Sequence, residues 1–118
     1  MAVDLTVIDN NYLLIKFNGS VSLISLIDML HKVADATLKT RINKYLFDLR
    51  ATINNASISD HCQATYSHSK TFDIPKDSKH ALLIDDDEFG FVMIQLKNNG
   101  YNAALFRNEE DALKWLLE

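Results

Sequence analysis

Apolar and polar residues alternate with a period of two along the first part of the chain. The apolar positions are Val3, Leu5, Val7, Leu13, Ile15 and Phe17. A period of two is typical of half-buried β-strands. Between Val7 and Leu13, the segment Asp9-Asn10-Asn11 tolerates the positive φ of a tight turn. The pattern therefore predicts a β-hairpin, which Gly19 and Ser20 end.

The period then changes to that of a helix. Apolar residues recur three and four positions apart, at Leu23, Leu26, Ile27, Leu30, Val33 and Ala34. Ser22 or Ser20 is placed to accept hydrogen bonds from the first free amides. We expect a helix from about residue 22 to 38. The short apolar run 45–49 that follows is typical of a strand buried between two layers.

The second half of the chain continues to alternate strands with helices. A weaker helical stripe through Ile58, Cys62 and Tyr66 predicts a helix that starts near Ser57. A polar loop over residues 71–79 holds the single proline. The remaining predicted elements are a strand at 81–84, a helix through Asn98 that Gly100 ends, a strand at 101–106, and a final helix that Asn108 and Asp111 cap.

The predicted order is β-β-α-β-α-β-α-β-α, which is typical of an α/β fold. Strands that alternate with helices are joined by right-handed crossovers, so the later strands lie parallel and the helices pack on the sheet. The first strand pairs antiparallel, at or near an edge. We expect a mixed, mostly parallel sheet within one domain over residues 1–118.

Composition excludes several classes of function. Twelve Lys and Arg against sixteen Asp and Glu give a net charge of −4, which argues against binding to nucleic acid or to an anionic membrane surface. One cysteine excludes an internal disulfide framework. No apolar run approaches the length of about 20 residues that spans a bilayer, and residues 1–4 lack the start of a signal peptide. We therefore expect a cytoplasmic protein without membrane insertion.

Two stretches resemble a known family. The strand Leu46-Phe47-Asp48-Leu49, with its loop and helix, is similar to the segment around the phosphorylated serine of bacterial anti-sigma-factor antagonists. Residues 105–116 resemble the ending of the SpoIIAA-like branch: phenylalanine, arginine, an acidic turn, alanine, tryptophan and leucine. The chain thus resembles the STAS domain, and more closely its SpoIIAA-like branch of mostly uncharacterised bacterial proteins. The resemblance implies a small, non-enzymatic regulatory module that acts through protein-protein interaction.

The same resemblance implies a phosphorylation switch. In the antagonists, a kinase that is also the anti-sigma factor phosphorylates a serine in an Asp-Ser-Ser-Gly motif at the start of the second helix. An ungapped alignment from Asp48 puts Ala56-Ser57-Ile58-Ser59 over that motif, so Ser57 takes the phosphorylated position and Ser59 is a second candidate. The motif's acid and glycine are missing here. Ser57 also forms a Ser-x-x-Asp capping pair with Asp60, a structural role that is compatible with modification.

The other chemistry-bearing residues have structural explanations as well. The acidic run 85–88 either binds a divalent cation or stabilises a helix dipole. His61 and His68 share a helix face, but zinc needs about four ligands, so we expect surface histidines and no metal site. Cys62 lies on the apolar stripe, which favours an inert buried thiol. Asp48 is expected to be a hydrogen-bonded or strand-end carboxylate, and no catalytic signature is present.

The third helix carries the most informative surface. Its core face holds Phe89, Val92, Met93 and Leu96. Phe91 and Ile94 lie on the opposite side, where they are either covered by another part of the chain or form a contact patch. Trp115 either covers the end of the domain or joins that patch. Gly90 inside the helix suggests that something approaches closely. We therefore predict that Phe91, Ile94 and Trp115 contact a protein partner or a second copy of the chain.

A different class of function remains open. Related folds enclose apolar or nucleotide ligands between sheet and helices, and a pocket lined by Tyr66, Phe72 and Phe89 would make the chain a ligand-binding domain. Enzymatic activity is the third hypothesis. It requires a nucleophile with a base, or a bound metal, and the sequence shows no motif for either. We expect no cofactor.

Overall fold

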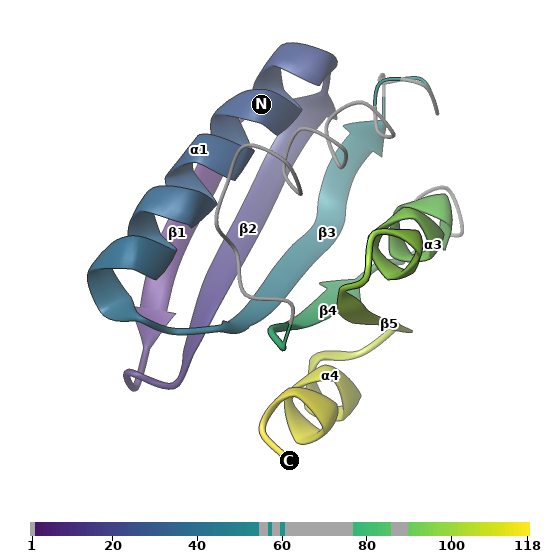
Figure 1. The fold of residues 1–118 in the computed structure, drawn as a ribbon. Helices are drawn as coiled ribbons and strands as arrows, with labels where there is room; N and C mark the ends of the chain where they lie inside the picture. Colours follow the sequence, from purple (N-terminus) through teal and green to yellow (C-terminus); the bar gives the residue numbers. More distant parts are fainter. Residues whose placement is uncertain (1, 55–56, 58–59, 61–76, 86–89) are drawn as a thin grey trace.

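The structure is a computed structural model that describes residues 2–54, 57, 60, 77–85 and 90–118 (Figure 1). The elements are β1 (Ala2–Ile8), β2 (Tyr12–Val21), α1 (Leu23–Thr40), β3 (Lys44–Asn54), β4 (Lys79–Leu83), α3 (Gly90–Asn98), β5 (Asn102–Phe106) and α4 (Glu109–Leu116). Their type and order are those that the sequence predicts. The helix predicted from Ser57 lies almost wholly outside the described residues.

The described strands form one five-stranded sheet in the order β1-β2-β3-β4-β5. β1 pairs antiparallel with β2, and the other neighbours are parallel. Asp9 and Asn10 both take a φ of 53°, and the Asn11 N–H donates to the Ile8 carbonyl at 2.8 Å. The mixed sheet and the hairpin at its edge are therefore confirmed, because these short polar residues accept the left-handed conformation that the turn requires.

Helix α1 begins and ends at residues suited to those positions. The Ser22 hydroxyl accepts a hydrogen bond from the Ser25 N–H at 3.3 Å, and the Ser25 hydroxyl accepts one from the Ser22 N–H at 2.8 Å. This reciprocal cap satisfies amides that have no partner within the helix. At the other end Arg41 takes a left-handed φ of 63°, and its N–H donates to the Thr37 carbonyl.

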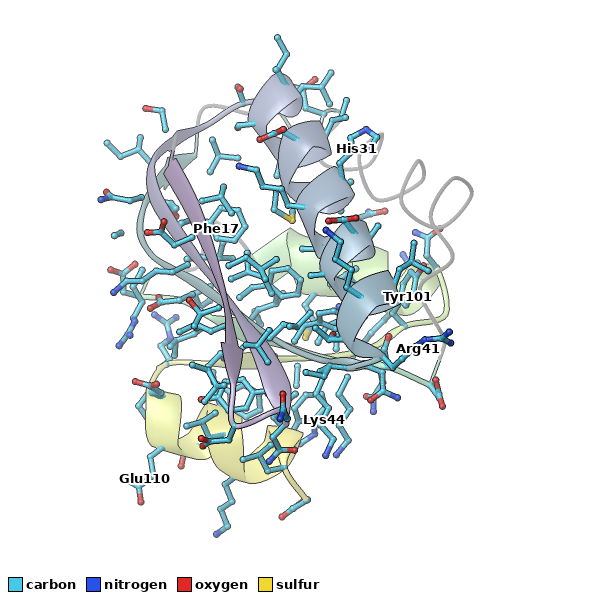
Figure 2. All side chains as sticks on the ribbon, turned by 90° about the vertical axis from the view of Figure 1, so that its left-hand side faces the viewer. Phe17, His31, Arg41, Lys44, Tyr101 and Glu110 are labelled. Carbon is cyan, nitrogen blue, oxygen red and sulfur yellow. The ribbon has the colours of Figure 1, made fainter. Side chains whose placement is uncertain are left out.

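The sheet separates two hydrophobic clusters. On one face, α1 and α3 pack against side chains that include Phe17, Phe47 and Leu82. On the other face, α4 packs against residues such as Leu46 and Leu83. Figure 1 shows α3 and α4 on opposite sides of β4 and β5, and Figure 2 shows Phe17 between the hairpin and α1. This three-layer arrangement follows from the apolar runs of β3 and β4, which bury both faces.

Strands β2 and β3 are longer than the sequence predicts. β2 continues through Gly19, whose φ is 102°, to Val21, and β3 continues to Asn54. The two polar ends pair with each other, with Gly19 opposite Thr52 and Val21 opposite Asn54. Val21 at the end of β2 is buried in the core, but residues 18–20 and 51–53 are exposed or half-buried, so hydrophobic periodicity underestimates both strands.

The two described histidines, His31 and His80, differ in burial. His31 is exposed, but His80 is only 1% exposed. The His80 ring stacks on Tyr45 and Phe47 with centroids 4.9 and 5.9 Å away, and its Nε2 lies 2.9 Å from the Ser78 hydroxyl. His80 alternates with Ala81 and Leu83 along β4, so it faces the α1 side of the sheet and becomes part of the core.

Candidate functional site

Several functional candidates gather where the parallel strands end. β3, β4 and β5 end at Asn54, Leu83 and Phe106, and the chain continues from these ends toward Ser57, α3 and α4. Parallel strands place their carboxyl ends at the same edge of a sheet, which we call the carboxyl edge. β4 and β5 end level with each other, at Leu83 opposite Phe106, whereas β3 continues from Asp48, its last partner in β4, to Asn54. In α/β sheets this is the edge at which ligands and modifications are most often found.

Ser57 lies just after β3 and is exposed. The Asp60 N–H donates to the Ser57 hydroxyl at 3.0 Å, and the Ser57 N–H donates to Asp60 Oδ2 at 3.1 Å. This reciprocal pair confirms the predicted Ser-x-x-Asp cap. The second phosphorylation candidate, Ser59, lies outside the described residues.

Asp48 and Arg50 form an ion pair on β3. Arg50 Nε donates to Asp48 Oδ1 and Arg50 Nη2 to Oδ2, each at 3.0 Å, while the Arg50 N–H donates to Oδ1 at 3.2 Å. The register between β2 and β3 shifts at this point and forms a β-bulge. The Arg50 N–H therefore donates to the Asp48 carboxylate rather than to β2. Burial would raise the pKa of Asp48, but the hydrogen bonds and charge of Arg50, with the charge of Lys16, lower it overall. Asp48 is therefore the hydrogen-bonded carboxylate that the sequence predicts.

Acidic side chains act on Arg50. The hydrogen bonds that Arg50 donates to Asp48 raise the Arg50 pKa, and the negative charges of Asp48, Glu109 and Asp85 add to the effect. Nearby, Arg107 Nη1 donates to the Asp85 carbonyl at 3.0 Å, which ties the start of the β5-α4 turn to the end of β4. The Asp111 N–H donates to Asn108 Oδ1 at 2.9 Å, as the predicted cap of α4 requires. The charged side chains of Arg50, Arg107 and Asp85 could contact a partner through hydrogen bonds and ion pairs.

Helix α3 presents one of its predicted contact residues to solvent. Ile94 is 52% exposed, while Leu96 is buried in the core and Met93 packs against it. Phe91 belongs to α3, but its side chain lies outside what the structure describes. The expectation that something approaches Gly90 is wrong for the described residues, because a Cβ added there meets no atom within 4 Å.

Trp115 lies on the other side of the sheet from Ile94. Its ring packs against Phe106 with centroids 5.6 Å apart, and Lys79 Nζ lies 5.1 Å from the ring centroid and donates to the Trp115 carbonyl at 3.0 Å. Trp115 thus covers the end of the domain, and the structure does not bring it into one patch with Ile94. The sequence gives no sign of this contact, since Lys79 is 36 positions away.

The ligand pocket stays a prediction. Tyr66, Phe72 and Phe89 lie outside the described residues, and the same holds for Cys62. His61 and His68, which share the predicted second helix, lie outside them too.

The part of the chain that the structure describes holds neither a metal cluster nor a membrane-spanning helix. Within residues 2–54, 57, 60, 77–85 and 90–118, no cluster of three or more His, Cys, Asp or Glu side chains is arranged to hold a metal ion. In the same ranges, no helix combines the length and the hydropathy needed to cross a membrane. Asp85 of the acidic run is exposed, and the rest of the run, residues 86–88, is not described.

No family model and no curated protein matches this chain. Its structure is nevertheless similar to solved structures over nearly its whole length. One is an uncharacterized protein of the DUF3478 family with a SpoIIAA-like fold from Shewanella loihica, with 18% identity, a TM-score of 0.63, and coverage of 98% of this chain and 92% of that one. Another is an anti-sigma factor antagonist from Mycobacterium paratuberculosis, with 10% identity, a TM-score of 0.67, and coverage of 99% and 94%.

A third similar structure is the Bacillus cell fate determinant SpoIIAA in its phosphorylated form. It has 12% identity and a TM-score of 0.59, and the match covers 97% of this chain and 98% of that one. At these identities the likeness concerns the fold, and it confirms the SpoIIAA-like fold that the sequence predicts.

Proposed function

We propose that this chain, which has the SpoIIAA-like fold, is a small non-enzymatic regulatory module of the bacterial cytoplasm that binds a protein partner. The partner is another protein or a second copy of the chain. The proposed contact surface consists of Ser57 at the carboxyl edge and the solvent side of α3, with Phe91 and Ile94. The fold supports this proposal, since two of the similar structures are anti-sigma factor antagonists.

The observation that carries the proposal is the position of Ser57. Its hydroxyl is exposed directly after β3 and accepts the Asp60 amide at 3.0 Å. A phosphate here would interact favourably with the dipole of the helix that the sequence predicts from Ser57, while adding nearly two negative charges. It would also lie beside the Asp60 carboxylate, which now accepts the Ser57 N–H at 3.1 Å. Like charges repel, so phosphorylation would open this reciprocal cap and change the surface that a partner meets.

The described interior supports a non-enzymatic role. Ser78 and His80 lie at hydrogen-bond distance, 2.9 Å, as a nucleophile and its base would. Both side chains are nevertheless enclosed, with exposed fractions of 0% and 1%. A substrate cannot reach this pair without opening the core, so its role is structural.

The proposed switch is tested with matched variants at residue 57. Protein purified from its own host is digested and its phosphate mapped, with Ser57→Ala as the control. We expect phosphate on Ser57 and none in the variant. Partner binding by Ser57→Asp, which keeps a capping side chain, should differ from binding by Ser57→Ala by about tenfold or more. Equal binding by both variants, with no phosphate on the wild type, would contradict the switch.

A further inference from the structure

Among the described residues, no hydrogen bond uses the backbone groups on the outer edge of β5. β5 is the last strand in the sheet order. The Ile84 N–H donates to the Phe106 carbonyl at 2.9 Å, so Phe106 directs its backbone groups toward β4. Because these groups alternate along a strand, Ala104 also faces β4, whereas Ala103 and Leu105 direct their N–H and C=O groups away from it.

This edge lacks the features that normally prevent strand pairing. Residues 101–106 read Tyr-Asn-Ala-Ala-Leu-Phe, without charge or proline. Exposed edges are usually protected by charged side chains, proline or a bulge. The opposite edge strand, β1, carries the exposed carboxylate of Asp4. The two edge strands therefore differ. The side chains of β5 include no charge or proline that would prevent it from pairing with another strand.

We propose that β5 pairs antiparallel with β5 of a second copy of this chain, with the two-fold axis at Ala104. In this register Ala103 lies opposite Leu105 of the second copy, and the two residues exchange both of their outward N–H···O bonds. Ala104 meets Ala104 of the second copy, where a small side chain permits close approach. The segment is thus complementary to itself, as an isologous interface requires. The pairing joins both sheets into one and does not depend on the role proposed for Ser57.

A charge-swap experiment tests the register. In the proposed dimer, Ala104→Lys places two like charges directly opposite each other, and so does Ala104→Glu. By sedimentation velocity of the full chain, each variant alone should dimerise at least about tenfold more weakly than the wild type, and an equal mixture of the two should recover the association. Thr6→Lys, on the exposed face of β1, is the matched control and should leave it unchanged.

Hydrogen exchange on the wild type tests the same pairing without a substitution. The amides of Ala103 and Leu105 should gain protection as the protein concentration rises, while the Ala104 and Phe106 amides, already bonded to β4, should not change. A wild type that stays monomeric, a mixture that fails to recover association, an equal loss in Thr6→Lys, or exchange that is independent of concentration would each overturn the proposal. Measurements of partner binding in variants of Ser57 or Ile94 bear only on the proposed function. They do not test the β5 pairing.

Discussion

Asp48 accepts three hydrogen bonds from Arg50 across a β-bulge, two from the guanidinium and one from the backbone. The side chain of Asp48 is only 8% exposed, whereas that of Arg50 is 41% exposed. A buried carboxylate needs such partners because an uncompensated charge in the interior is costly. The pair therefore lets β3 carry an acid through an otherwise apolar strand and extend to the carboxyl edge.

This pair predicts a pH dependence of stability. The pKa of Asp48 is lower in the folded chain than its ordinary value, so the unfolded chain binds more protons and stability rises with pH in the acid range. The contribution is complete above about pH 5 and is lost as the pH falls below about 4. Asp48→Asn should lower the free energy of unfolding at neutral pH by about 1–3 kcal/mol and make its acid decline shallower. Urea unfolding from pH 3 to pH 7 measures both effects. Asp4→Asn is the control for removal of one charge, and an unchanged slope in Asp48→Asn would contradict the assignment.

Arg41 predicts a stabilising substitution. It holds a φ of 63° at the end of α1, a conformation that favours glycine. Arg41→Gly should raise the free energy of unfolding by about 0.5–1 kcal/mol, since the relief of strain exceeds the greater freedom of glycine in the unfolded chain. Lys39→Gly, inside the last turn of the same helix, should lower it by about 1 kcal/mol. Thermal unfolding of both variants checks the contrast, and two changes of the same sign would contradict it.

At Gly90, replacing glycine by alanine should be stabilising. A Cβ there meets no atom of the described residues within 4 Å, so Gly90→Ala should raise the free energy of unfolding by up to about 1 kcal/mol through the lower entropy of the unfolded chain. Gly100 has a φ of 89° and serves as the comparison, because Gly100→Ala should be destabilising. Denaturant midpoints distinguish the two. If Gly90→Ala unfolds more easily, something does approach this residue.

Substitutions at Trp115 and at Ile94 should affect different properties, stability in the first case and partner binding in the second. Trp115 packs against Phe106 and Lys79, so Trp115→Ala should lower the free energy of unfolding by about 1–3 kcal/mol and leave partner binding intact. Ile94→Asp should change stability by no more than about 0.5 kcal/mol, because the side chain is half exposed, but should weaken binding. Unfolding curves and binding measured on the same preparations decide the matter. A Trp115→Ala variant that loses binding while keeping its stability would put Trp115 back in the contact surface.

The fold was largely predictable from the sequence because its signals are local. Period-two alternation, the Asp9-Asn10 turn, the Ser22 cap and the Asn108 cap each depend on residues close in the chain, and the structure confirms each. Alternation of strands with helices then determines the mostly parallel order.

The remaining features depend on contacts between distant residues. The ends of β2 and β3 pair with each other, and Trp115 contacts Lys79, 36 positions away. The ring of His80 stacks on Tyr45 and Phe47, and hydrophobicity alone does not show that this histidine is buried. For the candidate site, the capping geometry of Ser57 was predictable from the Ser-x-x-Asp spacing, but the Arg50 bulge was not, since it needs the register of a neighbouring strand.

Native mass spectrometry of the protein purified from its own host, read beside its mass under denaturing conditions, tests the central claim most directly. The wild type and the double variant Phe91→Asp with Ile94→Asp are compared at equal concentration. The proposed function predicts that the wild type retains a stoichiometric protein partner that the double variant loses while keeping its fold. A second copy that both proteins keep is assigned to the β5 pairing and does not count for the proposed function. A wild type that is a bare monomer, or that carries only a small noncovalent ligand, would contradict it.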